Sequence, residues 1–120
     1  MAKTLIVEDD RNLLDTLRYN LRKEGHDVVT AVDGAQALDV ARREKPDLII
    51  LDIMLPKLNG FEVCRMIKFD DNYKKLPIII LSALDQQQDR EKAIQNGADA
   101  YFIKPFDLGL LLNKIKELIG

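Results

Sequence analysis

Four short apolar runs stand out in the chain, and each ends in polar or turn-forming residues. Because the runs do not alternate with polar positions, they are typical of strands covered on both faces, as in a parallel sheet. A fifth and weaker candidate strand, residues 28–31, follows Gly25. The four stronger runs are residues 4–7, 48–51, 78–81 and 101–103.

Apolar residues with helical spacing lie between these runs. Leu13, Leu17 and Leu21 recur four residues apart, and Gly25 stands where a glycine commonly ends a helix. Three further apolar stripes indicate helices: Ala37, Leu38 and Ala41; Phe61, Cys64 and Ile67; and Leu111, Ile115, Leu118 and Ile119.

The stretch from Asp85 to Asn96 is mostly glutamine and charged residues, with Ala93 and Ile94 as its apolar positions. We therefore expect a loosely buried helix there, which ends at Gly97. With this helix, strand and helix alternate five times along the chain. Such alternation predicts an open, parallel α/β sheet with right-handed crossovers. We expect a single domain over residues 1–120.

Side chains capable of chemistry follow the strand-like runs at their carboxyl ends. In an open parallel sheet these ends share one edge, and ligands bind there. Two runs are followed by acids, one by a hydroxyl and one by a cation. The residues are Glu8, Asp9 and Asp10 after the first run, Asp52 after Leu51, Ser82 after Leu81, and Lys104 after Ile103.

Each of these residues also has a purely structural explanation. Acids at the start of a helix interact favourably with the helix dipole, and a lone serine such as Ser82 is most often an N-cap. The set as a whole points to chemistry. Crowded carboxylates repel one another, and an oxygen-rich site suits a hard divalent ion such as Mg²⁺. A carboxylate nucleophile beside Mg²⁺, with a lysine and a hydroxyl for the phosphoryl oxygens, is the apparatus for phosphoryl transfer to aspartate.

Five separated motifs, in order along nearly the whole chain, resemble the receiver domain of two-component response regulators. The resemblance implies a flavodoxin-like fold, a five-stranded parallel sheet in the order 2-1-3-4-5 with helices on both faces. The motifs are residues 5–10 (LIVEDD), residues 45–56 (KPDLIILDIMLP) with Asn59-Gly60, residues 81–83 (LSA), residues 97–101 (GADAY) and residues 104–106 (KPF).

The resemblance implies a metal site at the acidic positions. Asp52 is similar to the aspartate that accepts the phosphoryl group and also binds the metal. Glu8 and Asp9 resemble the acidic pair that holds Mg²⁺, in whose place Mn²⁺ can act. Asp10 corresponds to a neighbouring, less critical acid, and Met54 would offer its main-chain carbonyl to the metal.

The resemblance also implies a switch. Ser82 corresponds to the hydroxyl that bonds the phosphoryl group, and Lys104 to the cation that pairs with it. Tyr101 corresponds to an aromatic residue that turns inward when Ser82 moves. The bond between Lys104 and Pro105 corresponds to one that is cis in the family.

A receiver of this kind takes its phosphoryl group from a histidine kinase, a phosphotransfer protein or a small phosphodonor, and it loses it by slow autodephosphorylation. The surface of the last two helices and the fifth strand then controls a partner, an output domain or a phosphorylation-dependent homodimer. Arg90, Asp99 and Lys114 match parts of the charge-paired dimer face of DNA-binding regulators. Leu110 stands where that subfamily usually has an acid, so it is a candidate contact residue instead.

Three other interpretations compete with an active receiver. An aspartyl-phosphate hydrolase usually has a second catalytic aspartate two residues after the first, and here that position is Met54. A flavodoxin-like redox module would place a flavin phosphate after the first strand, where Glu8 and Asp9 would repel it. A degenerate receiver, used only for protein contacts, would not need the complete set of acceptor-site residues that the sequence contains.

The composition of the chain limits the kinds of partner and ligand that we expect it to bind. The chain has 120 residues and a formal net charge of −2, which provides no general attraction to nucleic acid or anionic membrane. Its one cysteine, Cys64, excludes an internal disulfide and a cysteine-rich zinc site. The sequence begins without a signal-peptide core and contains no apolar stretch of about 18 residues. We expect a cytoplasmic domain that binds neither membrane nor nucleic acid directly, whether it stands alone or belongs to a longer regulator.

Overall fold

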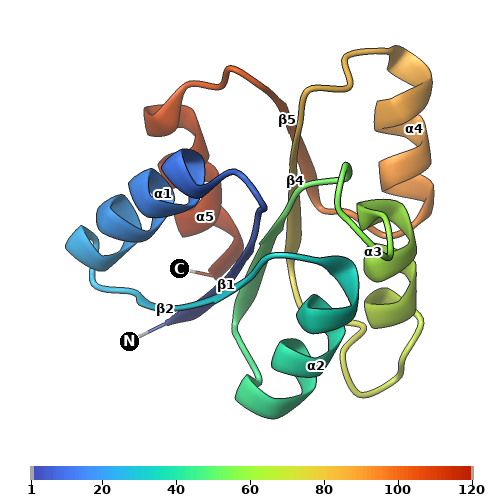
Figure 1. The fold of residues 1–120 in the computed structure, drawn as a ribbon, viewed down its shortest axis with the longest axis horizontal. Helices are drawn as coiled ribbons and strands as arrows, with labels where there is room; N and C mark the ends of the chain where they lie inside the picture. The colour runs from blue at the N-terminus through green and yellow to red at the C-terminus, as the bar shows by residue number, and fades with distance from the viewer. Residues whose placement is uncertain (1, 120) are drawn as a thin grey trace.

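The computed structural model describes residues 2–119, and the apolar runs form one five-stranded sheet within them (Figure 1). All neighbouring strands are parallel, and their order is β2-β1-β3-β4-β5, which confirms the expected fold. The strands are β1 (Lys3–Val7), β2 (Asp27–Ala31), β3 (Leu48–Leu51), β4 (Ile78–Ser82) and β5 (Ala100–Ile103).

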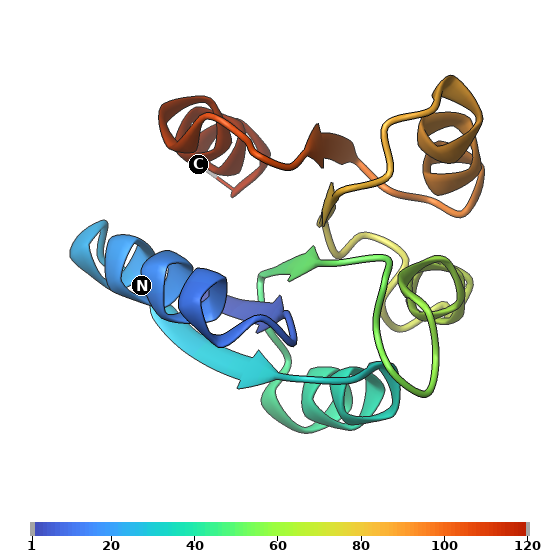
Figure 2. The same cartoon turned by 45° about the horizontal axis from the view of Figure 1, so that its top comes forward.

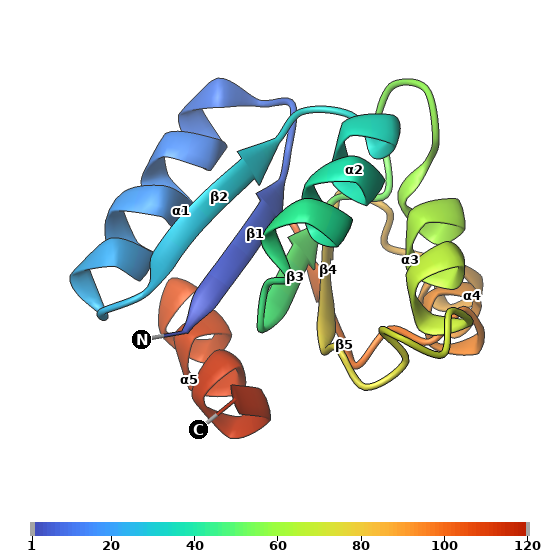
Figure 3. The same cartoon turned by 90° about the horizontal axis from the view of Figure 1, so that it is seen from below.

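Two layers of helices cover the sheet, with α1 and α5 on one face and α2, α3 and α4 on the other (Figures 2 and 3). The helices are α1 (Arg11–Lys23), α2 (Gly34–Glu44), α3 (Gly60–Lys68), α4 (Gln87–Gln95) and α5 (Leu108–Ile119). Of these described helices, none is long and apolar enough to cross a membrane.

The lack of alternation in the strands follows from this two-layer arrangement. Leu5 and Val7 of β1 pack towards α2 and α3, whereas Ile6 between them packs towards α1 and α5. Successive side chains of a strand point to opposite faces, so nearly every position in a strand with both faces covered is apolar. β2 lies at the edge of the sheet, and its half-buried Val28 and Val29 explain its weaker hydrophobic pattern.

The polar stretch after β4 forms the expected weakly attached helix, although α4 is shorter than residues 85–96. Ala93 is its one buried side chain among the described residues, and Ile94 is exposed. Gly97 follows the helix with a φ of +97°, a conformation that glycine adopts without strain. Ser82 is the last residue of β4, and Gln86 is the N-cap of α4, so the N-cap explanation for Ser82 does not hold.

Gly60, the first residue of α3, lies directly against the end of β3. Its N–H donates a hydrogen bond of 2.8 Å to the carbonyl of Ile53. A Cβ atom at this position would lie 2.4 Å from the carbonyl oxygen of Asp52 and 2.6 Å from Ile53 Cα. The contact involves backbone on both sides, so the start of α3 has a fixed position relative to Asp52.

Gly60→Ala is expected to lower the free energy of unfolding by about 3 kcal/mol or more, since overpacking costs roughly 1–3 kcal/mol even where flexible side chains can yield. Urea denaturation measures the change. Gly109→Ala is the matched control, because its added Cβ would meet only the Asp107 carboxylate, at 3.1 Å. That exposed helical position should change stability by no more than about 1 kcal/mol. Equal stability of the two variants would contradict the close approach.

Candidate functional site

Three residues continue the sheet's hydrogen-bond ladder one position beyond the strand ends. The N–H of Glu8 donates to Ala31 O at 3.1 Å, and the N–H of Asp52 donates to Val7 O at 3.1 Å. On the other side, the N–H of Lys104 donates to the carbonyl of Ser82 at 2.8 Å. These bonds fix the backbone of each residue, so the site is built on the rigid part of the fold.

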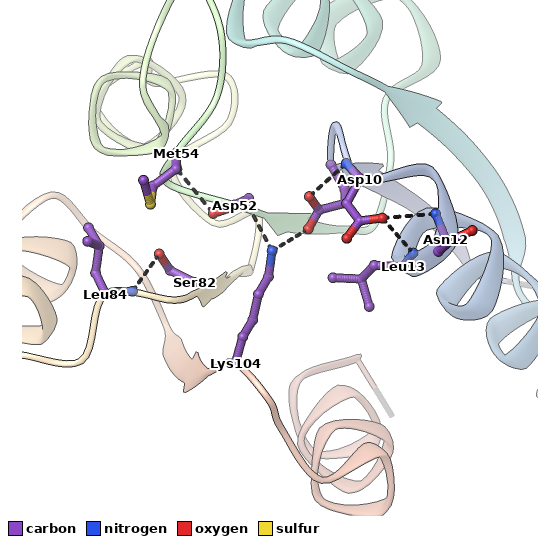
Figure 4. A network of polar contacts seen from close by, with 9 residues as sticks. Asp10, Asn12, Leu13, Asp52, Met54, Ser82, Leu84 and Lys104 are labelled. Carbon is purple, nitrogen blue, oxygen red and sulfur yellow. Dashed lines mark hydrogen bonds and ion pairs between the residues drawn. The ribbon is translucent and has the colours of Figure 1, made fainter.

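The ammonium group of Lys104 joins two buried carboxylates from different strands. Lys104 Nζ donates to Glu8 Oε1 at 2.8 Å and to Asp52 Oδ2 at 2.9 Å (Figure 4). Glu8 is 2% exposed and Asp52 is 5% exposed. The lysine therefore supplies the positive charge that keeps two acids in a largely buried location.

Burial raises the pKa of Glu8 above its ordinary value of 4.5, although bonds from Lys104 and from the N–H of Asp10 offset part of the effect. Burial by itself would lower the pKa of Lys104. The hydrogen bonds to Asp52 and Glu8 outweigh it, so the pKa of Lys104 is raised above 10.5. Lys104 is consequently a fixed cation at neutral pH.

The remaining oxygen of Asp52 is also engaged. Asp52 Oδ1 accepts a hydrogen bond of 3.1 Å from the N–H of Met54. The side chain of Met54 is exposed, at 58%, and takes no part in this contact. The backbone at residue 54 thus lies next to the Asp52 carboxylate, while the side chain at this position is free to vary.

Glu8, Asp9 and Asp52 form an acidic cluster whose ligand oxygens lie within 4.8 Å of one another. Asp9 is exposed, and it gives the cluster an opening to solvent. Three carboxylates around one lysine leave a surplus of negative charge, which a divalent cation with oxygen ligands would neutralise. Asp10 has a structural role instead. Its side chain is the N-cap of α1 and accepts hydrogen bonds from the backbone N–H groups of Asn12 and Leu13.

Ser82 and Tyr101 are linked through the main chain of Leu84. Ser82 is fully buried, and its hydroxyl accepts a hydrogen bond of 3.3 Å from Leu84 N–H. The hydroxyl of Tyr101 donates to Leu84 O at 2.7 Å. Tyr101 is 8% exposed, and burial raises the pKa of its phenol. The structure therefore holds the Tyr101 ring inward, and the movement of Tyr101 on phosphorylation stays a prediction.

The four candidate interface residues have different surroundings. Arg90 lies over the Tyr101 ring, 5.5 Å from its centroid. Lys114 pairs with Glu117 of the same helix at 2.9 Å, and Leu110 is 60% exposed.

Asp99, by contrast, has internal partners. Asp99 Oδ2 accepts a 2.8 Å bond from the N–H of Ile78 and lies 3.0 Å from Lys68 Nζ. Lys68 is only 12% exposed, and its ammonium also donates to Leu76 O at 2.7 Å. The sequence pattern gave no sign of this pair, because the two residues lie on elements far apart in the chain. Asp99 has a role in the fold whether or not it also contacts a partner.

The expected cis peptide bond between Lys104 and Pro105 is present. It directly follows the residue that joins Glu8 to Asp52.

Known proteins share this fold. Residues 4–116 match the family described as the response regulator receiver domain. The alkaline phosphatase synthesis transcriptional regulatory protein PhoP of Bacillus subtilis is 42% identical over 117 residues, which are 98% of this chain and 48% of PhoP. The DNA-binding dual master transcriptional regulator RpaA of Synechocystis is 40% identical over 119 residues, 99% of this chain and 49% of RpaA.

Among solved structures, the BeF3-activated N-terminal receiver domain of Klebsiella pneumoniae RstA superposes with a TM-score of 0.90 at 33% identity. The match covers 98% of this chain and 97% of that one. The chain spans about half the length of the curated relatives it matches. It belongs to the response regulator receiver family, the phosphorylation-activated signalling domains of two-component systems.

Lys104→Met is expected to lower the free energy of unfolding in metal-free buffer at pH 7 by roughly 2 kcal/mol. Two buried carboxylates would then lack their cation, which costs about 3–5 kcal/mol in a fully buried pair. Lys104 is 22% exposed, so the loss should be smaller. Urea denaturation measures it, and added Mg²⁺ should narrow the gap.

Lys3→Met is the control, because Lys3 pairs with Glu44 at 3.3 Å where both side chains are about one-third exposed. Exposed pairs contribute about 0–1 kcal/mol. An equal loss of unfolding free energy in both variants would show that the Lys104 bridge stabilises the fold no more than an exposed ion pair does.

Proposed function

We propose that this domain is a phosphorylation-activated switch whose acceptor is Asp52. The supporting observation is the position of Asp52, a buried carboxylate at the end of β3 that contacts Lys104 and belongs to the acidic cluster. The phosphoryl group comes from a histidine kinase, a phosphotransfer protein or a small phosphodonor. Signalling is the output of the reaction, and slow autodephosphorylation resets it.

The transfer needs few protein groups. A carboxylate oxygen of Asp52 attacks phosphorus, the bond from phosphorus to the leaving group breaks, and an acyl phosphate forms. Lys104, held by Glu8 and Asp52, is placed to balance negative charge on the phosphoryl oxygens. Ser82, buried at the end of the neighbouring strand, supplies a hydroxyl for one of those oxygens.

The acidic cluster fits Mg²⁺, with Mn²⁺ as a substitute, because these ions prefer oxygen ligands. Asp9, Asp52 and the main-chain carbonyl of Met54 would hold the ion. Glu8 would contribute through water, as the family resemblance implies. Bound Mg²⁺ supplies charge neutralisation for the transferred group.

The side chains around Asp52 do not favour a hydrolytic enzyme. The exposed thioether of Met54 can act neither as a general acid nor as a general base two residues after the acceptor. A switch that retains its phosphate long enough to signal is therefore the better proposal.

We place the signal output on the surface of α4, β5 and α5. Arg90, Leu110 and Lys114 lie on this surface, where the exposed Leu110 is the best candidate for a contact with a partner or a second copy. PhoP and RpaA are named as transcriptional regulators, so an output partner or domain that acts on transcription is a reasonable proposal for this chain in the cytoplasm. The receiver itself would make no direct contact with nucleic acid.

Asp52→Asn should abolish phosphorylation, because an amide cannot form the acyl phosphate. The wild-type domain, incubated with Mg²⁺ and acetyl phosphate, should gain the mass of one phosphoryl group. That group should be labile to hydroxylamine and should not appear in the presence of EDTA. Intact-mass spectrometry gives the readout.

Asp47→Asn is the matched control, since Asp47 lies just before the opposite end of β3 and its side chain, among the described residues, bonds only the N–H of Lys3, at 2.8 Å. This variant should be phosphorylated like wild type. Labelling of the Asp52 variant at the wild-type rate would reject Asp52 as the acceptor.

A further inference from the structure

The attachment of α4 to the rest of the domain depends on charged side chains more than on apolar ones. Among its described residues Ala93 alone is buried, and Ile94 points to solvent with 58% exposure. The other residues of the helix are polar or charged, so burial of apolar surface cannot hold it firmly.

Two cationic side chains of α4 contact aromatic rings of two different neighbouring elements. Arg90 lies over the Tyr101 ring of β5 at 5.5 Å, and the ammonium of Lys92 lies over the Phe61 ring of α3 at 4.6 Å from the ring centroid. Residues two apart on a helix do not face the same side, so the two contacts pull towards different neighbours. In the described part of the chain Lys92 has no carboxylate within 4 Å, and the ring is its specific partner.

Phe61 connects this contact to the acceptor. It follows Gly60, whose backbone lies against the carbonyl of Asp52 with no room for a side chain. Phe61 is 8% exposed and belongs to the core between the sheet and α2, α3 and α4. The ring is therefore fixed relative to Asp52, and Lys92 fixes α4 relative to the ring.

On its other side, α4 contacts Tyr101 of β5, whose ring points inward. The Tyr101 hydroxyl needs the carbonyl of Leu84, three residues before α4, and its ring lies under Arg90. A shift of α4 away from α3 would change both contacts together.

We infer that Lys92 is a positioning residue of the switch, which holds α4 against Phe61 and so favours the arrangement with Tyr101 inward. This inference rests on the proposed function for its consequence in signalling. If phosphate favours the same arrangement, a domain without the Lys92 contact binds a phosphoryl analogue more weakly, because part of the binding free energy must first restore α4.

The test uses Lys92→Met, which keeps the length of the side chain and removes its charge. With Mg²⁺ present, the affinity for beryllofluoride should fall about two- to fivefold, the effect of one exposed cation–π contact. Lys92→Arg retains a cation and should stay close to wild type. Lys23→Met removes the corresponding contact with Tyr19 on α1, at 5.8 Å, and should leave the affinity unchanged.

A double-mutant cycle identifies the partner. Phe61→Leu should weaken beryllofluoride binding to a similar degree, and adding Lys92→Met to it should cause no further loss. Independent losses that multiply would overturn the inference, as would an Arg variant that falls as far as the Met variant.

Hydrogen exchange of the α4 amides gives a second readout that needs no phosphoryl analogue. Lys92→Met should speed exchange in α4 about two- to fivefold, with the amides of α1 unchanged. Unchanged exchange in α4 would overturn the anchoring role. If wild type itself failed to bind beryllofluoride, the proposed function would fail, and the exchange rates would still decide whether Lys92 anchors α4.

Discussion

The ammonium of Lys104, bonded at 2.8 Å to Glu8 and at 2.9 Å to Asp52, is the interaction on which the proposed acceptor site depends. Two carboxylates that are at least 95% buried would repel each other and lose their hydration without it. The same cation stands where a phosphoryl group on Asp52 would carry its charge. In the proposed switch a single side chain balances charge before the reaction and is available for the product, so phosphorylation of Asp52 would redistribute the contacts of Lys104.

The rest of the domain divides into a rigid part and a weakly attached one. Backbone hydrogen bonds extend the sheet to Glu8, Asp52 and Lys104, and the buried strands around them leave no freedom to shift. The helix α4 lacks such packing and relies on polar and cation–π contacts. We propose that a change of charge at the rigid site is expressed as movement of α4, which costs little to move.

The sequence was sufficient to predict the parallel sheet, because each buried strand is a continuous apolar run and each helix carries its own stripe. It also placed the acidic cluster, Ser82 and Lys104 at one edge, since strand ends in a parallel sheet must converge. The strand order came from the family resemblance. The contacts of α4 and the pair of Lys68 with Asp99 could not be predicted, because they depend on distances between elements that no local pattern encodes. The inward position of Tyr101 depends on a main-chain carbonyl, Leu84 O, which any residue would provide.

The most direct test of the account is chemical trapping of the acyl phosphate. Borohydride reduces an aspartyl phosphate to homoserine, which peptide mass spectrometry can place at one position. After incubation with Mg²⁺ and acetyl phosphate, the account predicts homoserine at position 52 alone. Homoserine at Asp9 or Asp10, or none anywhere in a domain that has gained a phosphoryl group, would contradict it.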